Sequence, residues 1–157
     1  MLKTVLTSLF ITLILATVGC SEKAVSPEEQ VRAMLAAGEV AVESRSVTGS
    51  GAFIAENYRD ESGRQRKDLL RLLAGYFLAH QKIHLLVQVN RIQLIGSNRA
   101  EVTLFVAVAG RSEISLEKLS TIRADLVRFD LELGKTDGEW LLRSAQWRRA
   151  KQLDFLE

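Results

Sequence analysis

The chain has one cysteine and one proline in 157 residues, and its formal net charge is only +2. A lone cysteine excludes a disulfide within the chain and any metal site built on paired thiolates. The small net charge gives no electrostatic reason to expect a nucleic acid as partner. The sequence also lacks a phosphate-cradling glycine loop, a Gly-x-Ser-x-Gly turn and a His-Glu-x-x-His pair. We therefore predict no cofactor, no metal ion and no nucleic acid.

Residues 1–19 have the layout of a secretory signal peptide. Lys3 supplies a positive charge, and the segment from Val5 to Val18 is apolar apart from serine and threonine. A helix needs roughly 20 apolar residues to cross a bilayer, and this run is shorter. The pattern therefore predicts a cleaved export signal.

The segment TVGC, which ends at Cys20, resembles the lipobox of bacterial lipoproteins, although that family usually has leucine where Thr17 stands. The resemblance implies that residues 1–19 are removed and that Cys20 carries acyl chains such as palmitate. Residues 20–26 are then a tether to a membrane of the cell envelope. Ser21 after the cysteine favours, by the same resemblance, the outer membrane facing the periplasm. The alternative is a free thiol in a signal-anchor helix.

One domain follows the tether. Residues 27–150 have the length of a single globular domain, and residues 151–157 are a short tail. The domain begins with a helix, because Ser26 is a natural N-cap, Pro27 suits the first helical position and Glu29 completes a capping box.

Two more helices are expected before the strands begin. Residues 51–58 predict a short helical turn that follows a glycine-rich break. Residues 64–80 predict a longer amphipathic helix, whose apolar stripe includes Tyr76 and His80. Arg64 is expected on the exposed face of this helix.

From Ile83 the hydrophobic period changes from that of a helix to that of a strand. The first strand slips by one residue at Asn90, as a β-bulge would produce, and a turn rich in Gly, Ser and Asn leads to a second strand. Two further strands are joined by an Asp-Gly turn at residues 135–138. A second bulge is expected between Leu126 and Val127.

Helices followed by four long antiparallel strands predict an α+β fold, in which a strongly curved sheet wraps around the N-terminal helices. This order, together with NYRDESG at residues 57–63 and the hairpin FDLELGKTDGEWLLRSAQW at residues 129–147, resembles the nuclear transport factor 2-like superfamily of cystatin-like α+β cones. The resemblance implies a pocket between the sheet and the helices and, in many members, a dimer through the outer sheet face. It implies no particular activity.

Tyr58 and Asp60 are the candidates for catalysis. The resemblance places them where ketosteroid isomerase-like members have polar pocket residues. An aspartate in an apolar pocket has a raised pKa and can act as a general base. The alternative is that Asp60 belongs to a polar turn.

Four other residues are candidates for binding, namely Tyr76, Arg123, Asp125 and Trp147. Arg123 and Asp125 alternate with apolar residues on the third strand, and the expected bulge would turn them toward the pocket. On a regular strand they belong instead to a solvated face that forms cross-strand ion pairs. Tyr76 and Trp147 lie on apolar stripes and fit the core equally well.

These features predict a non-enzymatic, lipid-anchored module of the cell envelope that binds a small apolar ligand or an envelope protein. The cone pocket and the outer sheet face are the expected binding surfaces. Phe105 and Leu86 lie opposite the main apolar sets of their strands, which favours a cover on that face, such as the second subunit of a homodimer. The alternative is a small pocket enzyme of the isomerase or dehydratase kind, with Asp60 as base.

Overall fold

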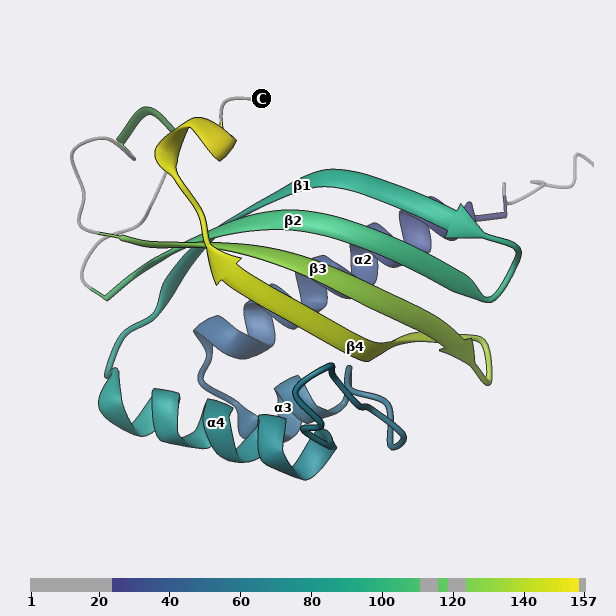
Figure 1. Ribbon diagram of the computed structural model, residues 1–157, viewed down its shortest axis with the longest axis horizontal. Coiled ribbons are helices and arrows are strands. Elements are labelled where there is room, and N and C mark those ends of the chain that lie inside the picture. Colours follow the sequence, from purple (N-terminus) through teal and green to yellow (C-terminus); the bar gives the residue numbers. More distant parts are fainter. Residues whose placement is uncertain (1–23, 111–115, 119–123, 156–157) are drawn as a thin grey trace, which may run out of the picture.

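The computed structural model describes residues 24–110, 116–118 and 124–155. Helices lead into a four-stranded sheet (Figure 1), so the predicted α+β order is confirmed. The helices are α2 (Pro27–Glu43), α3 (Val47–Gly51) and α4 (Arg66–Ala79). The strands are β1 (His84–Ile95), β2 (Arg99–Ala109), β3 (Asp125–Thr136) and β4 (Glu139–Arg149), and the short 3-10 turns are η1 (Leu116–Lys118) and η2 (Gln152–Phe155).

Side chains fix both ends of α2. The hydroxyl oxygen of Ser26 accepts from the N–H of Glu29 at 3.2 Å, and the Glu29 carboxylate accepts from the N–H of Ser26 at 2.7 Å. The predicted capping box is therefore present. After the other end, Arg45 has a φ of 57°, and its guanidinium donates to the carbonyl of Phe77 at 2.6 Å. This hydrogen bond ties the end of α2 to the last turn of α4.

The sheet is an antiparallel meander with the strand order β1-β2-β3-β4. The register of β1 against β2 shifts between Val89 and Arg91, where the bulge at Asn90 was expected. Asp137 and Gly138 have φ values of 51° and 87°. Positive φ at both central residues is what a type I′ turn requires, and this turn matches the twist of the strands that it joins.

The prediction of a bulge between Leu126 and Val127 is wrong, because β3 pairs with β2 in one unbroken register. The two side chains therefore point to opposite faces of the sheet, as neighbours in a regular strand do. Leu126 is apolar because it packs with Phe105 on the outer face. The register shift lies instead between Glu132 and Leu133, in the pairing of β3 with β4.

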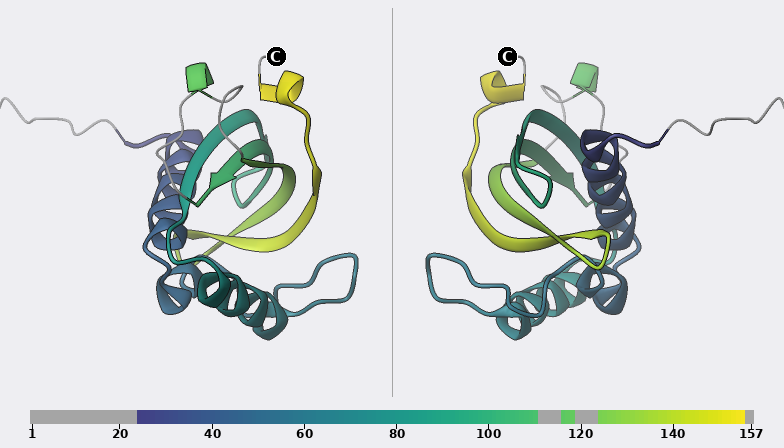
Figure 2. Two further views of the ribbon diagram at one scale, coloured as in Figure 1. Left: turned by 90° about the vertical axis from the view of Figure 1, so that its left-hand side faces the viewer. Right: turned by 90° about the vertical axis from the view of Figure 1, so that its right-hand side faces the viewer.

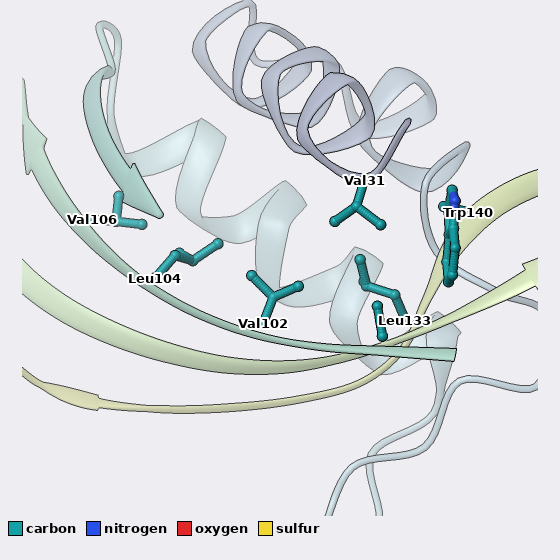
Figure 3. Packing of buried hydrophobic residues seen from close by; sticks show 7 residues of the cluster. Val31, Val102, Leu104, Val106, Leu133 and Trp140 are labelled. Atoms are coloured by element: carbon teal, nitrogen blue, oxygen red, sulfur yellow. The ribbon is translucent and has the colours of Figure 1, made fainter. Parts of the chain in front are cut away.

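The sheet curls around α2 (Figure 2), and the main core lies on its concave face. Figure 3 shows Val31 of α2 facing Val102, Leu104 and Val106 of β2. Val31 is fully buried at this contact. Trp140 lies at the end of the cluster beside the β3–β4 hairpin. The helix is therefore held by apolar contacts along the strands.

The 3-10 turn η2 covers part of the outer face. Phe155 of η2 is 1% exposed and packs against Phe105 and Ala107 of β2. The ring centroids of Phe105 and Phe155 are 5.6 Å apart. We expected a second subunit to cover Phe105 and its apolar neighbours on this face. Here η2 covers them instead, although the sequence pattern assigned its residues to a tail.

Candidate functional site

Residues 52–65 connect α3 to α4 and run beside β4 (Figure 1). The N–H of Ala55 donates to the carbonyl of Leu142 at 2.9 Å, and the N–H of Leu142 donates to the carbonyl of Phe53 at 2.8 Å. The expected helical turn at residues 51–58 is therefore wrong, because these backbone groups pair with the sheet edge instead. The pairing brings the next residues of the segment, Tyr58 and Asp60, against the concave side of β4.

Tyr58, Asp60 and Arg64 form one polar cluster, in which Tyr58 and Asp60 are buried and Arg64 is partly exposed. Tyr58 is 2% exposed, and its hydroxyl donates to Asp60 Oδ2 at 3.4 Å. Arg64 Nε donates to the same oxygen at 2.7 Å, and the Arg64 N–H donates to Asp60 Oδ1 at 3.0 Å. The Asp60 carboxylate, 2% exposed, is thus paired with a guanidinium. Asp60 also belongs to the turn that was the alternative prediction for it, since its carbonyl accepts from the N–H of Gly63.

The electrostatics of the cluster keep Asp60 ionised. Burial raises the pKa of Asp60, but the hydrogen bonds and the charge of Arg64 outweigh burial, so that the pKa lies below its ordinary value. Burial and the Asp60 charge raise the pKa of Tyr58 to about 12. At neutral pH the pair is therefore a carboxylate and a neutral phenol. A general base for a weakly acidic proton needs a raised pKa, whereas this carboxylate has a lowered one.

This ion pair predicts a pH-dependent contribution to stability. An unfolded aspartate titrates at about pH 4, and the folded-state pKa of Asp60 is lower. The contribution is therefore complete above about pH 4 and is lost as the pH falls through the folded-state pKa. We expect the wild type to be more stable than Asp60→Asn at neutral pH, with a difference that shrinks toward about pH 2. Urea unfolding at a series of pH values measures this difference.

Arg64→Gln is the matched variant for that series, because it removes the same ion pair from the other side. Asp130 also has a lowered pKa, through its hydrogen bond from Arg128, but it is common to the wild type and both variants and cancels in the comparison. A stability difference that stays constant from neutral to acidic pH would contradict a stabilising role of the ion pair.

Arg64 joins this cluster to Trp147. The guanidinium carbon lies 4.3 Å from the centroid of the Trp147 ring, in the position of a cation–π contact. Trp147 is 38% exposed and lies 6.2 Å from the ring of Phe129. The sequence pattern did not reveal this role of Arg64, since α4 begins only at Arg66 and Arg64 precedes it. The signal that could have revealed this role is the pair of opposite charges, Asp60 and Arg64, on either side of the Ser-Gly turn.

A separate cavity of about 390 Å³, which we call the Tyr76 cavity, lies where α4 ends, β2 ends and β3 begins. Its lining residues are Tyr76, His80, Lys82, Val108, Ala109, Gly110, Ala124 and Asp125. Tyr76 stacks on His80 with the ring centroids 4.0 Å apart. Burial, with the charge of Asp125 as a second cause, raises the pKa of Tyr76. The cavity therefore combines a few small apolar side chains with a neutral phenol, an imidazole, a lysine and a carboxylate.

The predicted site residues lie at two separate places, the Tyr76 cavity and the polar cluster around Asp60. Tyr76 and Asp125 line the Tyr76 cavity, while Trp147 belongs with Tyr58 and Asp60. Asp125 reaches the cavity by regular alternation, opposite Val108, rather than through a bulge. Arg123 and Cys20 lie outside the described residues. His80 and Lys82 were not among the candidates for this cavity.

The described ranges contain neither a metal cluster nor a bilayer-spanning helix. No three His, Cys, Asp or Glu side chains in these ranges lie together in a way that could hold a metal ion. None of the helices in the same ranges is both long enough and apolar enough to cross a membrane.

A four-stranded antiparallel sheet that curls around helices is the α+β cone of nuclear transport factor 2-like and cystatin-like proteins. The fold class predicted from the sequence is thereby confirmed.

Solved structures of low sequence identity share this fold. A proposed scytalone dehydratase from Novosphingobium aromaticivorans matches with a TM-score of 0.65 at 14% identity, over 79% of this chain and 84% of that one. A proposed dehydratase of the nuclear transport factor 2-like family from Streptomyces avermitilis gives 0.63 at 17% identity, over 80% and 97%. A Nostoc punctiforme domain of unknown function with a cystatin-like fold gives 0.60 at 20% identity, over 82% and 80%. The sequence matches no family model and no curated protein.

Proposed function

We propose that this chain is a lipid-anchored, non-enzymatic module of the cell envelope that holds a small, largely apolar ligand in the Tyr76 cavity. The observation that carries the proposal is the lining of that cavity, where Val108 and Ala109 lie beside Tyr76 and Asp125. Cavities of roughly 300–1,000 Å³ with apolar walls and a few polar groups are typical small-molecule sites. The Asp125 carboxylate accepts hydrogen bonds, and the Tyr76 phenol both donates and accepts. Together they would orient a ligand that carries a polar group.

The membrane anchor in this proposal is Cys20. Its support is the lipobox-like segment TVGC after an apolar run that is too short to span a bilayer. Two acyl chains on one residue are enough for stable attachment. Residues 20–26 would then tether the domain, and Ser21 favours the outer membrane with the domain in the periplasm.

A pocket enzyme of the isomerase or dehydratase kind is the second candidate. The observation that favours it is the fold-level likeness to two proteins described as proposed dehydratases. Asp60 would be its base, with Tyr58 beside it. The ion pair with Arg64 and the lowered pKa of Asp60 weigh against this role, and we therefore favour binding.

Native mass spectrometry of the protein extracted from the membranes of its own host tests both parts of the proposal. We expect a polypeptide that begins at an acylated Cys20 and that carries a small molecule released on collisional activation. The double variant Tyr76→Phe, Asp125→Asn should keep the acyl chains and lose the small molecule. Asp137→Asn, the same change in the turn at the other end of β3, should keep both.

The two parts of the proposal fail separately in this experiment. A Cys20 without acyl chains contradicts the anchor and leaves the cavity untouched. A protein that carries no small molecule, or a small molecule that the double variant retains, contradicts the Tyr76 cavity as the binding site.

A further inference from the structure

A second cavity, of about 540 Å³, lies at the opposite end of β3 and is formed by the first turns of α2, the segment after α3 and the β3–β4 hairpin. We call it the hairpin cavity. Its lining includes Gln30, Met34, Phe53, Lys135, Glu139 and Trp140. It shares no lining residue with the Tyr76 cavity, so the two can be tested independently.

Trp140 lines this cavity and carries an unpartnered donor. The residue is 4% exposed, and its indole nitrogen is buried without a hydrogen-bond partner among the described residues. Figure 3 shows the ring extending from β4, with the nitrogen on the side away from Leu133. Buried donors without partners are rare in native proteins and destabilise them. A bound molecule that supplies an acceptor would relieve this cost once a small shift of the lining side chains uncovers the nitrogen.

Lys135 brings a positive charge to the same cavity. Its ammonium donates to the Gln30 side-chain oxygen at 2.8 Å and lies 5.7 Å from the centroid of the Trp140 ring. No ion pair joins Lys135 to a carboxylate within the described ranges. Gln30 is a neutral acceptor and occupies one of the three donors of an ammonium. Within the described ranges, the Lys135 ammonium therefore has a positive charge without an ion-pair partner and further donors for a ligand.

We propose that the hairpin cavity binds a small apolar carboxylic acid in its ionised form. The two oxygens of a carboxylate offer several acceptor positions, which suits an ammonium and an indole N–H on neighbouring side chains. The apolar part of the ligand would lie against Met34 and Phe53. Glu139, the acidic member of the lining, is exposed, so it lowers the affinity for an anion without closing the site.

The indole N–H signal of Trp140 is a direct readout of this binding. The chain has two tryptophans, and Trp147→Phe assigns their signals in a ¹H–¹⁵N spectrum of the full-length chain. We expect 3-phenylpropionate to shift the Trp140 signal saturably. It should bind at least about tenfold more tightly than 3-phenylpropionamide, because a hydrogen bond to a charged group is the stronger one.

Three variants make the test specific. Lys135→Met keeps an apolar stem without the charge and should abolish the preference for the acid, while its dispersed spectrum shows that it is folded. Glu139→Gln removes the competing charge and should tighten binding of the acid about threefold, leaving the amide unchanged. The double variant Tyr76→Phe, Asp125→Asn should alter neither affinity.

Four results would overturn the proposal. Three of them are an unsaturable or absent shift of the Trp140 signal, equal affinities for the acid and the amide, and a preference for the acid that survives in Lys135→Met. Loss of binding in the Tyr76→Phe, Asp125→Asn variant would assign the acid to the other cavity and would also overturn it. None of these results bears on the acylation of Cys20.

Discussion

Replacement of Tyr58 by alanine is expected to lower the free energy of unfolding by about 3–5 kcal/mol, the range found when a buried aromatic side chain is removed. Tyr58 is 2% exposed and packs in a cluster with Ile54, Ala145 and Leu69. Alanine leaves an empty space between residues 52–65 and β4, and the backbone pairing with the sheet limits how far the segment can collapse into it. Urea unfolding followed by circular dichroism measures the change.

Tyr58→Phe separates packing from hydrogen bonding. It keeps the ring and loses only the 3.4 Å hydrogen bond to Asp60, so we expect a fall of no more than about 1 kcal/mol. The folded-state pKa of Tyr58 is about 12, and a free phenol titrates at about 10. The wild type should therefore lose stability relative to Tyr58→Phe as the pH rises above about 10. Equal losses in the alanine and phenylalanine variants would show that packing is not the cause.

Phe155→Ala is expected to remove about 1.5–3 kcal/mol of stability and to make the protein self-associate. This loss is the contribution of burying a phenylalanine side chain without a cavity term, because η2 can leave the sheet and no enclosed space remains. Phe155 is 1% exposed on Phe105 and Ala107. Without its ring, η2 loses its contact with the sheet and uncovers an apolar patch that also includes Leu86 and Leu126. Exposed apolar patches on a sheet face promote association. Analytical ultracentrifugation over a range of concentrations measures it.

Leu153→Ala is the control for this prediction. Leu153 lies in the same 3-10 turn and is 69% exposed, so its loss should change stability by no more than about 0.5 kcal/mol and leave the oligomeric state unchanged. If Phe155→Ala has the same oligomeric state as the wild type at every concentration, η2 does not act as a cover. The homodimer through the outer sheet face, or a contact with an envelope protein there, stays a prediction, and this pair of variants shows whether η2 competes with it.

Patterns among residues that are close in the sequence predicted the order of helices, strands and turns in this fold. The capping box at Ser26 and Glu29, the strand alternation from Ile83 and the Asp-Gly turn each depend on residues within a few positions of one another. Such features are visible in a single sequence because neighbouring side chains and backbone dihedrals decide them. The α+β order then followed, because amphipathic helices must cover the apolar face of an antiparallel sheet.

The candidate site was harder to predict, because long-range contacts decide it. Tyr76 and Asp125 line one cavity although they belong to different elements, and the bulge that was expected to turn Asp125 inward was wrong. Arg64 was assigned to a helix face, yet it bonds to Asp60 and covers Trp147. Phe155 looked like part of a tail because nothing near it in sequence reveals that it packs on β2. Each of these contacts joins segments that are far apart in the sequence. The hydrophobic period within one segment cannot reveal such a contact.

The position of α2 within the cone has a consequence for how the anchored protein would stand. Gln30, in the first turn of α2, lines the hairpin cavity, and the seven residues from Cys20 to Ser26 can extend over at most about 25 Å. If Cys20 is held in lipid, the start of α2 and the hairpin cavity beside it would stay within reach of the bilayer surface, while the Tyr76 cavity at the other end of β3 would be free to lie farther away. A molecule leaving the lipid would then meet the hairpin cavity first.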